Sequence, residues 1–589
     1  MASQERTDIV DQLLHAGLEN IEKDPEFNKE DYHKVKNGIY KTHGVSKPFQ
    51  SIELIERYHQ LIATGEMRED FVFIKLLRKR WVRSLSGVTV ISLLTEFFGC
   101  PGQCVYCPSF EGLPKSYIPH EPAVMRAELN KFDPVMQIHN RLRGLEVTGH
   151  KIEKNDVRVI WGTWSVYPRK YQEGFIKAIY DAFNSYDDMK KHIEETDLSS
   201  DRFAAFKVKQ WYKMKASKDL AEAKKINETS RCRVIGMAIE TRPDWLDAEE
   251  IARLRTYWIT RVEIGYQTTD DAINTLNKRG HWNKESIAGT KMLKDAGMKV
   301  VAHMMPNLLG STPDKDRESM QEIFDDQNFR PDELKIYPMV VTDKSELTEI
   351  WREGWFTAYD DETLIDLTVD LEKMIPEYVR LNRTYRDIPG EMILEGSKLA
   401  NLRQIVENKM EAEWIKLFDI RHRELKNKKN KPAWAIMNTM KYEASDGIEY
   451  FITFEDPLDR TIFSLTRFRI PSGTPVIHES SEDSIASPMK KHNKSGEVIQ
   501  DITDVLPELK WASIIREIHT FWDQLSVWEK WGEFGQHVGF WKRLIVEAER
   551  LSLQHGLKKI AVIAGVGVRA YYEKRWYHLE WEYMVKYLT

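Results

Sequence analysis

Short β-rich runs alternate with helical stretches between residues 86 and 345. The helical stretches include DAEEIARLRTY and KESIAGTKMLKDAG, and the β-rich runs are VTVISLL, DVRVIWG, VIGMAIE, TRVEIGYQ, MKVVAHMMP and ELKIYPMVV. Strands that alternate with helices run parallel, because each helix returns the chain to the same edge of the sheet. The pattern predicts an α/β sheet or partial barrel, in which ligands gather at the carboxyl ends of the strands.

Three of the four cysteines lie together in TEFFGCPGQCVYCPSF, residues 95–110, directly after the first of these strands. Cys100, Cys104 and Cys107 are therefore expected at the carboxyl end of the sheet. A structural zinc site needs a fourth ligand, and nothing in the spacing of His120 argues for that role. Iron–sulfur clusters accept thiolates readily, and three thiolates leave one iron open. An open iron that binds substrate is the arrangement of the radical S-adenosylmethionine (SAM) enzymes.

The composition is that of a globular protein with several domains. The chain has 589 residues, of which 42% are hydrophobic and 30% charged, and this length predicts roughly two to four domains. No apolar run approaches the roughly 18 residues that cross a bilayer, and the polar N-terminus does not read as a secretory signal. Uneven cysteine spacing gives no disulfide framework, so we expect a cytoplasmic protein without membrane contact. A net charge of −6 restricts nucleic-acid binding to local patches.

The pattern of residues outside this α/β region predicts three further regions of the chain. Residues 346–431 read as a mostly helical connection, and residues 432–589 as a second α/β domain with antiparallel strands. Two charged or polar stretches, 185–230 and 478–510, read as insertions. Residues 1–85 read as helical. They end in a basic cluster that is either a solvated helix face or a phosphate-binding patch, formed by Lys75, Arg78, Lys79, Arg80 and Arg83.

Several stretches resemble one family, in order, from about residue 70 to the C-terminus. They are CVYCP, IETRPD, TRVEIGYQ, KRGH, KVVAHMMPNL, FRPDELKIYP, YRDIPGE, FEDP, REIHTF, QHVGF, GVGVRAYYEK and YMVK. The chain thereby resembles the catalytic subunit of the Elongator complex and its stand-alone bacterial and archaeal relatives. The resemblance implies an α/β fold, with a radical-SAM partial (β/α) barrel in residues 86–345 and a GNAT-like acetyltransferase domain in residues 432–589. The basic helical region 1–85 would then bind tRNA.

The same resemblance implies the reaction. The family is a tRNA-modifying enzyme that uses acetyl-CoA to place a carboxymethyl group on C5 of the wobble uridine, position 34. Its cofactors are a 4Fe–4S cluster and SAM, and it needs tRNA and an electron donor as partners, as a homodimer or a stand-alone enzyme. Since the C5–H of uracil and the methyl group of a thioester both resist polar activation, radical chemistry suits this transfer. Two other readings remain open: a protein lysine acetyltransferase, and a homologue that binds tRNA but does not catalyse.

Site residues follow from the resemblance by matching position. The cluster ligands are Cys100, Cys104 and Cys107, and the predicted SAM contacts are Gly162, Thr163, Glu240, Arg242, Glu263 and Gln267. Catalytic candidates are Tyr337, which would reach the substrate base, and the paired Tyr571 and Tyr572 near the thioester. Acetyl-CoA contacts are Lys154, Glu517, Ile518, His519, Thr520, Gln536, Gly539, Phe540, Trp541, Lys542 and Tyr572. For each polar side chain the alternative is a structural hydrogen bond or ion pair, and for Lys154 it is a solvated surface position.

The chain departs from the family in three respects. Its first two cluster cysteines have three residues between them, where the family usually has nine, and cysteines that some relatives carry in the connecting region are absent, so we expect no zinc there. Five tryptophans stand where the family has glycine, namely Trp161, Trp258, Trp522, Trp541 and Trp576. An indole at Trp161 would obstruct the approach of SAM, and one at Trp541 would obstruct the phosphate loop, because glycine leaves such places open. Taken literally, this favours the inactive homologue.

A decoding difference explains the tryptophans better. The chain has 18 tryptophans and only 30 glycines, where average usage predicts roughly 41 glycines. In some bacteria UGA encodes glycine, while another code reads it as tryptophan. We therefore predict that several of these tryptophans are glycine in the native protein. Sequencing the gene should show UGA at codons 161, 258 and 541, and UGG at all three would end the hypothesis.

Overall fold

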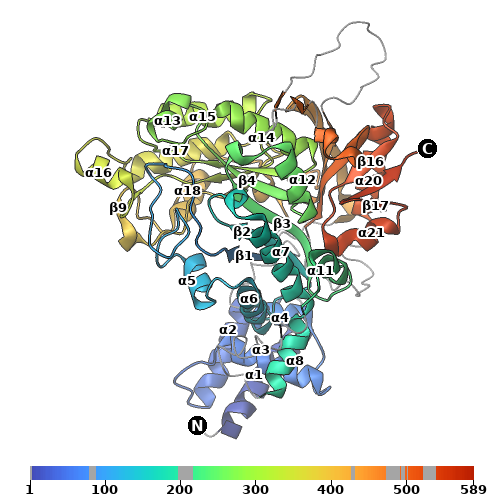
Figure 1. The fold of residues 1–589 in the computed structure, drawn as a ribbon. Coiled ribbons are helices and arrows are strands. Elements are labelled where there is room, and N and C mark those ends of the chain that lie inside the picture. The colour runs from blue at the N-terminus through green and yellow to red at the C-terminus, as the bar shows by residue number, and fades with distance from the viewer. Residues whose placement is uncertain are drawn as a thin grey trace.

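Seven parallel strands form the central sheet of the chain (Figure 1). Their order is β1-β2-β3-β4-β5-β6-β8, and every neighbouring pair is parallel. The strands are β1 Thr89–Leu94, β2 Lys154–Ile160, β3 Arg233–Thr241, β4 Arg261–Gln267, β5 Lys299–Met304, β6 Glu333–Ile336 and β8 Arg380–Arg383. The first six coincide with or overlap the six β-rich runs, so the predicted partial barrel of parallel strands is confirmed.

The computed structural model describes most of the chain. The described residues are 3–24, 26–77, 88–196, 212, 216–425, 432–471, 491–492, 498–499, 502–521 and 539–589. Of the predicted site residues, Arg78, Lys79, Arg80, Arg83 and Gln536 lie outside them, and so does Trp522.

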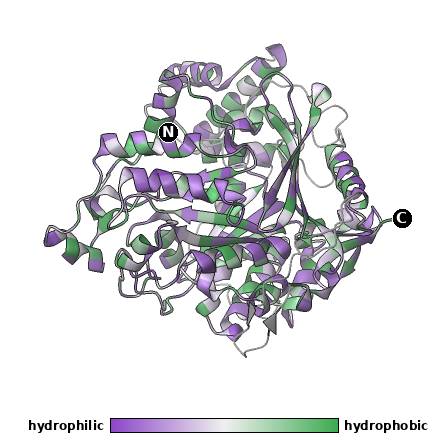
Figure 2. Ribbon diagram, turned by 90° about the horizontal axis from the view of Figure 1, so that it is seen from above, coloured by the Kyte–Doolittle hydropathy of each residue, from purple (hydrophilic) through white to green (hydrophobic). Residues whose placement is uncertain are grey.

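Helices connect the strands of the barrel and continue beyond it. They are α5 Pro122–Leu129, α6 Pro134–Val147, α7 Arg169–Asn184, α8 Tyr186–Glu195, α11 Leu220–Asn227, α12 Ala248–Thr256, α13 Asp271–Leu276, α14 Asn283–Asp295, α15 Pro313–Asp325, α16 Glu346–Arg352, α17 Asp361–Lys373, α18 Leu402–Ala412 and α19 Ile420–Arg423. α12 shows why such segments are helical: the Asp247 side chain accepts a hydrogen bond from the Glu250 N–H and caps the first turn. Its Ile251 and Leu254 are buried, and hydrophobic and hydrophilic segments alternate along the helices (Figure 2).

Two details of this region differ from the sequence analysis. The run ELKIYPMVV is not one strand: β6 ends at Ile336, and β7 (Val341–Thr342) pairs instead with β9 (Ile393–Glu395). Pro338 explains the break, because proline has no N–H to give to a ladder. The stretch read as a surface insertion after residue 185 includes α8 and α11, which bury apolar side chains such as Met189 and Ala223.

Four helices at the N-terminus form a separate apolar cluster, as the sequence predicted. They are α1 Ser3–Lys23, α2 Lys29–Thr42, α3 Ser51–Ala63 and α4 Phe71–Leu77, and they lie at the blue end of the ribbon beneath the barrel (Figure 1). Leu13, Tyr32, Tyr58 and Phe73 are buried between them. Lys75 belongs to α4. Within the described residues, no helix is long and apolar enough to cross a membrane.

A second, mostly antiparallel sheet follows, with the strand order β10-β11-β12-β15-β16-β18-β17. Its strands are β10 Ile436–Ala444, β11 Gly447–Glu455, β12 Ile462–Ile470, β15 Ala512–Thr520, β16 Lys559–Val562, β17 His578–Glu580 and β18 Tyr583–Tyr587, and β13 Lys491–His492 and β14 Val498–Ile499 form a separate pair. Its helices are α20 Phe540–Gln554 and α21 Arg569–Glu573. The predicted antiparallel strands and following helix are present, whereas β10 and β17 were not predicted.

Buried charges join the two sheets. Asp332, which precedes β6, accepts hydrogen bonds of 2.5 and 2.9 Å from Arg516 of β15. Burial alone would raise the pKa of the Asp332 carboxyl, but the cations of Arg516 and Lys294 hold it well below its ordinary value. We call this group the Asp332 cluster; its members are Asp332, Lys294, Asp295, Glu449, Arg467, Arg469 and Arg516.

Backbone strain is present at two of the tryptophans that replace a family glycine. Trp258 has φ 64° and Trp576 has φ 66°, a region that bulky L-residues rarely adopt. Trp258 is buried, and its Nε1 has no hydrogen-bond partner among the described residues. The backbone is therefore strained at these two positions, as expected where the family has glycine.

We predict that Asp332→Asn destabilises the protein by about 3–5 kcal/mol at pH 7, because removing one partner of a buried pair leaves the cations uncompensated. The measurement is equilibrium unfolding in denaturant, followed by circular dichroism. Glu349→Gln is the matched control, since Glu349 pairs with Arg352 on an exposed surface, where ion pairs stabilise little. Equal unfolding midpoints for the two variants would contradict the prediction.

Candidate functional site

A cavity of about 590 Å³ opens at the carboxyl ends of the barrel strands, and we call it the barrel cavity. Cys100, Cys104 and Cys107 line one side of it, in the loop that follows β1. Polar residues at the ends of β3, β4, β5 and β6 line the same cavity, among them Glu240, Glu263, His303 and Lys335. The expectation that the cysteine loop lies at the carboxyl end of the sheet is thus met.

Each of the three cysteines has a short-range contact that positions it at the cavity. The Cys107 N–H donates to the Cys104 carbonyl at 3.1 Å, and Cys100 Sγ lies 3.6 Å from the Thr163 hydroxyl. Arg279 Nη1 donates to Cys104 Sγ at 3.6 Å. A hydrogen bond from Cys107 and then the Arg279 cation lower the pKa of Cys104 against the effect of burial. Three free thiols beside a buried cation suit an anionic cluster, so the residues present fit the 4Fe–4S group.

A buried ionic group lines the same barrel cavity as the cysteines. Lys335 of β6 contacts Glu263 of β4 and lies 3.5 Å from Glu240 of β3, and His303 Nε2 lies 2.9 Å from Glu263. Burial opposes ionisation of Glu263, but the Lys335 cation holds the pKa of that carboxyl well below its ordinary value. Glu240, Glu263 and His303 are arranged closely enough to ligate a metal, but the Lys335 ammonium already supplies the positive charge between them. Two predicted SAM contacts thus have structural ion pairs, which was the alternative reading.

The other predicted SAM residues also line the barrel cavity. Gly162, Thr163 and Gln267 line the barrel cavity. Arg242 also lines it, although the Asp244 carboxylate accepts two hydrogen bonds of 2.9 Å from its guanidinium group. A Cβ added at Gly162 would approach only the Lys115 carbonyl, at 3.7 Å.

Trp161 corrects the sequence analysis. Its indole does not line the barrel cavity: it is buried in the main apolar core, where its ring centroid lies 4.7 Å from that of Tyr167. The alternation of side chains along an extended chain explains this: Ile160, the last residue of β2, lines the cavity, so the next side chain, Trp161, points to the opposite face. Its Nε1 has no hydrogen-bond partner among the described residues. The predicted obstruction of SAM by this indole is therefore wrong, although the buried N–H carries a cost.

Tyr337 lies where the sequence placed it, at the end of β6. It lines the barrel cavity, and its ring centroid is 5.5 Å from that of His303. Residues that the sequence analysis missed surround it, including Tyr117, Lys335 and Arg386. The sequence could have indicated His303 and Lys335, because they open the strand-end segments HMMP and KIYP. Lys335 lies two residues before Tyr337, and residues two apart share a face of a strand.

The predicted acetyl-CoA residues gather at an open side of the second sheet. The ladder between β15 and β16 ends at the pair Ile515 and Val562, whereas β15 continues to Thr520 beside β12. Among the described residues, Ile518, His519 and Thr520 therefore have a strand partner on one side only. Glu517 instead pairs with Lys299 of the barrel at 2.5 Å, so its side chain serves the junction between the sheets.

An aromatic group lies at the start of α20. Gly539, at φ 75°, precedes the helix, and Phe540, Trp541 and Lys542 form its first turn. The Trp541 ring packs edge-on against Tyr571, with centroids 4.8 Å apart, and lies 6.5 Å from Tyr572. The indole thus occupies the helix N-terminus beside the paired tyrosines.

Lys154 lies near the same part of the second sheet. It opens β2 in register with Arg233 of β3, and a Cβ added at Gly567 would lie 2.6 Å from the Arg233 Cβ. Gly565 approaches the Ile235 carbonyl so closely that a Cβ would lie 2.1 Å from it. Burial lowers the pKa of Lys154, so this lysine is not the fully solvated side chain of the alternative reading.

Comparisons with known proteins agree with this geometry. The radical SAM superfamily model matches residues 97–323, and the Radical_SAM C-terminal domain matches residues 331–412. The tRNA uridine(34) acetyltransferase of Dehalococcoides mccartyi is 35% identical over 87% of this chain and 100% of its own length. Elongator complex protein 3 of Homo sapiens is 30% identical over 99% of this chain and 96% of its own length. The chain belongs to the Elongator complex protein 3 family.

The solved structures extend this conclusion to the fold of the family. The archaeal Methanocaldococcus infernus Elp3 with an N-terminal deletion superposes with a TM-score of 0.65 at 31% identity, covering 85% of this chain and 100% of that one. The resemblance stated from the sequence and the radical-SAM barrel it implied are confirmed. Membership in the radical SAM superfamily implies a 4Fe–4S cluster and SAM, for which the barrel cavity provides three thiols.

Proposed function

We propose that this protein is a tRNA-modifying enzyme that places a carboxymethyl group from acetyl-CoA on C5 of uridine 34. The observation that carries the proposal is the barrel cavity, which is lined by three thiols of one loop and by a buried group of ionic side chains. Relatives named tRNA uridine(34) acetyltransferase, which match almost the whole chain, support the same activity.

The barrel cavity would hold the radical chemistry. A 4Fe–4S cluster bound by Cys100, Cys104 and Cys107 would supply the electron that cleaves SAM. Gly162 leaves room for the methionyl part of SAM, because a Cβ there would meet nothing closer than 3.7 Å. Lys335 can donate a hydrogen bond to a uracil carbonyl, and the ring of Tyr337 offers a surface beside it. The target base must leave its stack to reach them.

The second sheet would hold acetyl-CoA in the manner of a GNAT-like domain. The unpaired side of β15 at Ile518–Thr520 suits the acyl chain, and the N–H groups at the start of α20 suit the pyrophosphate. Tyr571, Tyr572 and Lys154 would lie beside the thioester. Trp541 occupies the same helix end, so glycine at this position would leave the phosphate site more open.

The remaining assignments belong to the same proposal. We assign tRNA binding to residues 1–85, radical chemistry to 86–345, a connecting role to 346–431 and acetyl-CoA to 432–589. The enzyme would act in the cytoplasm with an electron donor, either as a homodimer or alone. The basic residues Lys75, Arg78, Lys79, Arg80 and Arg83 would contact tRNA phosphates.

The test is anaerobic reconstitution with iron and sulfide, followed by incubation with SAM, acetyl-CoA and tRNA. We expect SAM to be cleaved to 5′-deoxyadenosine, acetyl-CoA hydrolysis to be stimulated by tRNA, and carboxymethyluridine to appear in digested tRNA. Cys104→Ala should abolish 5′-deoxyadenosine formation. Cys232→Ala is the matched control, because Cys232 is buried in the main apolar core and does not line the cavity.

The two other readings predict different results in the same experiment. Acyl transfer to protein lysines without SAM or a cluster would identify a protein acetyltransferase. Tight tRNA binding without SAM cleavage or acetyl-CoA hydrolysis would identify a non-catalytic homologue. Either result would overturn the proposed function.

A further inference from the structure

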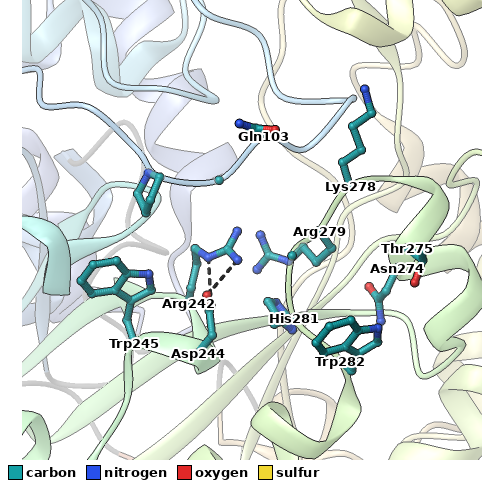
Figure 3. A pocket seen from close by; sticks show the side chains of 13 residues that line it. Gln103, Arg242, Asp244, Trp245, Asn274, Thr275, Lys278, Arg279, His281 and Trp282 are labelled. Carbon is teal, nitrogen blue, oxygen red and sulfur yellow. Dashed lines mark hydrogen bonds and ion pairs between the residues drawn. The ribbon is translucent and has the colours of Figure 1, made fainter. Parts of the chain in front are cut away.

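A second cavity, of about 510 Å³, lies beside the cysteine loop, and we call it the loop cavity (Figure 3). The KRGH segment, residues 278–281, forms part of its lining. Residues 101–103 of the cysteine loop and the segment from Arg242 to Trp245 complete its walls. Gly102, Arg242 and Arg279 line both the loop cavity and the barrel cavity. The two arginines therefore form part of the wall between the cavities.

The two arginines differ in their countercharges. Arg242 is paired with Asp244, as the dashed lines in Figure 3 show, and Lys278 at the cavity mouth is paired with Glu346 at 2.5 Å. Among the described residues, no carboxylate forms an ion pair with Arg279, which is only 7% exposed. The contacts of its guanidinium group are Cys104 Sγ at 3.6 Å and the Gly265 carbonyl at 3.1 Å.

A buried cation without a carboxylate is costly unless another negative group compensates it. The cysteine thiolates, and the cluster they would hold, are the negative groups within reach of Arg279. A protein sets the reduction potential of an iron–sulfur cluster mainly through hydrogen bonds to the sulfurs and through the local net charge. A cation beside Cys104 favours the reduced cluster, which carries one more negative charge.

We propose that Arg279 is a positioning residue that raises the reduction potential of the cluster through its hydrogen bond and charge at Cys104. This inference rests on the proposed cluster site, but not on the tRNA reaction. Arg242 contributes less, because Asp244 neutralises it. The KRGH segment thereby receives a role that the sequence analysis did not assign.

The test is a redox titration of the reconstituted protein without tRNA or acetyl-CoA, followed by electron paramagnetic resonance of the reduced cluster. We expect Arg279→Gln to lower the ratio of reduced to oxidised cluster about tenfold at a fixed potential, equivalent to about 59 mV for one electron. Arg279→Lys keeps the charge and should lie closer to the parent protein. Lys278→Gln, the neighbouring exposed and paired cation, should change the ratio less than twofold.

Two outcomes would overturn the proposal. One is an Arg279→Gln protein with full iron and sulfide content and an unchanged potential. The other is loss of iron from both the Gln and the Lys variants, which would show that Arg279 only holds the loop in shape. Failure of the tRNA reaction with a normal Arg279 effect would count against the proposed function instead.

An independent observation concerns the tryptophans. In the part of the chain that the structure describes, seventeen non-glycine residues have positive φ, and five of them are tryptophans: Trp258, Trp414, Trp511, Trp576 and Trp581. Three of them, Trp414, Trp511 and Trp581, were not identified from the family resemblance. Positive φ crowds the Cβ of an L-residue against the preceding peptide group, and glycine avoids this contact.

Three of these tryptophans end helices in the Schellman motif. In each, the tryptophan N–H binds the carbonyl three residues back, and the next N–H binds the carbonyl five residues back, as Ile415 does to Met410 at 2.9 Å. These are Trp258, Trp414 and Trp576. Six other ends with the same two bonds carry glycine at positive φ, namely Gly44, Gly65, Gly149, Gly297, Gly354 and Gly556, and two carry lysine, Lys131 and Lys278.

The other two tryptophans also stand at turns. Trp581 is the first residue of a two-residue hairpin loop between β17 and β18, with φ 48°, where a glycine is favoured. Trp511 precedes β15 with φ 60°. Burial of the indole does not offset the backbone strain at Trp414 and Trp576, since these side chains are 90% and 86% exposed.

We infer that the native protein carries glycine at Trp258, Trp414, Trp511, Trp576 and Trp581, and that its gene reads UGA as glycine. The test is the gene sequence together with peptide mass spectrometry of the protein from its natural source. We expect UGA codons and glycine masses at 414, 511 and 581. Trp164 and Trp351, which have no positive φ, should be UGG and tryptophan. UGG codons or tryptophan masses at 414, 511 and 581 would overturn the inference.

Discussion

The Asp332 cluster fixes how the two halves of this protein meet. Asp332 lies at the start of β6, and Arg516 reaches it from β15 of the second sheet, with both side chains fully buried. Charges this deep are stable only when paired in good geometry, so any other docking of the two sheets would leave them uncompensated. Because Lys335 and Tyr337 lie at the carboxyl end of β6, and β15 ends at the predicted acyl site, this junction also sets the relation between the two candidate sites.

The barrel brings together residues that lie far apart in the sequence. The cysteine loop follows β1, whereas Glu240, Glu263, His303 and Lys335 come from four later strands, and parallel pairing aligns their carboxyl ends. The result is a cavity lined by thiols and by compensated charges. Arg279 lines both the barrel cavity and the loop cavity, and Gly102 of the cysteine loop does so too.

Local patterns in the sequence were sufficient to predict the first six strands of the barrel, the cysteine loop and the family. They did not reveal which side chains would pair across strands, because partners such as Lys335 and Glu263 are set by register. Glu240 and Glu263 were therefore read as SAM contacts, and Glu517 as an acyl-chain residue, although all three have ion pairs in the structure. Trp161 was placed in the cofactor path because sequence position does not show to which face a strand-end residue points. The positive φ of Trp414, Trp511 and Trp581 is equally invisible before the backbone is known.

The central claim is that Cys100, Cys104 and Cys107 hold a cluster with one iron open to SAM. Electron paramagnetic resonance of the reconstituted, reduced protein, with and without SAM, tests it most directly. The account predicts iron and sulfide in the proportions of a 4Fe–4S cluster and a reduced signal that changes when SAM is added. A protein that binds zinc in place of iron, or a cluster signal that SAM leaves unchanged, would contradict it.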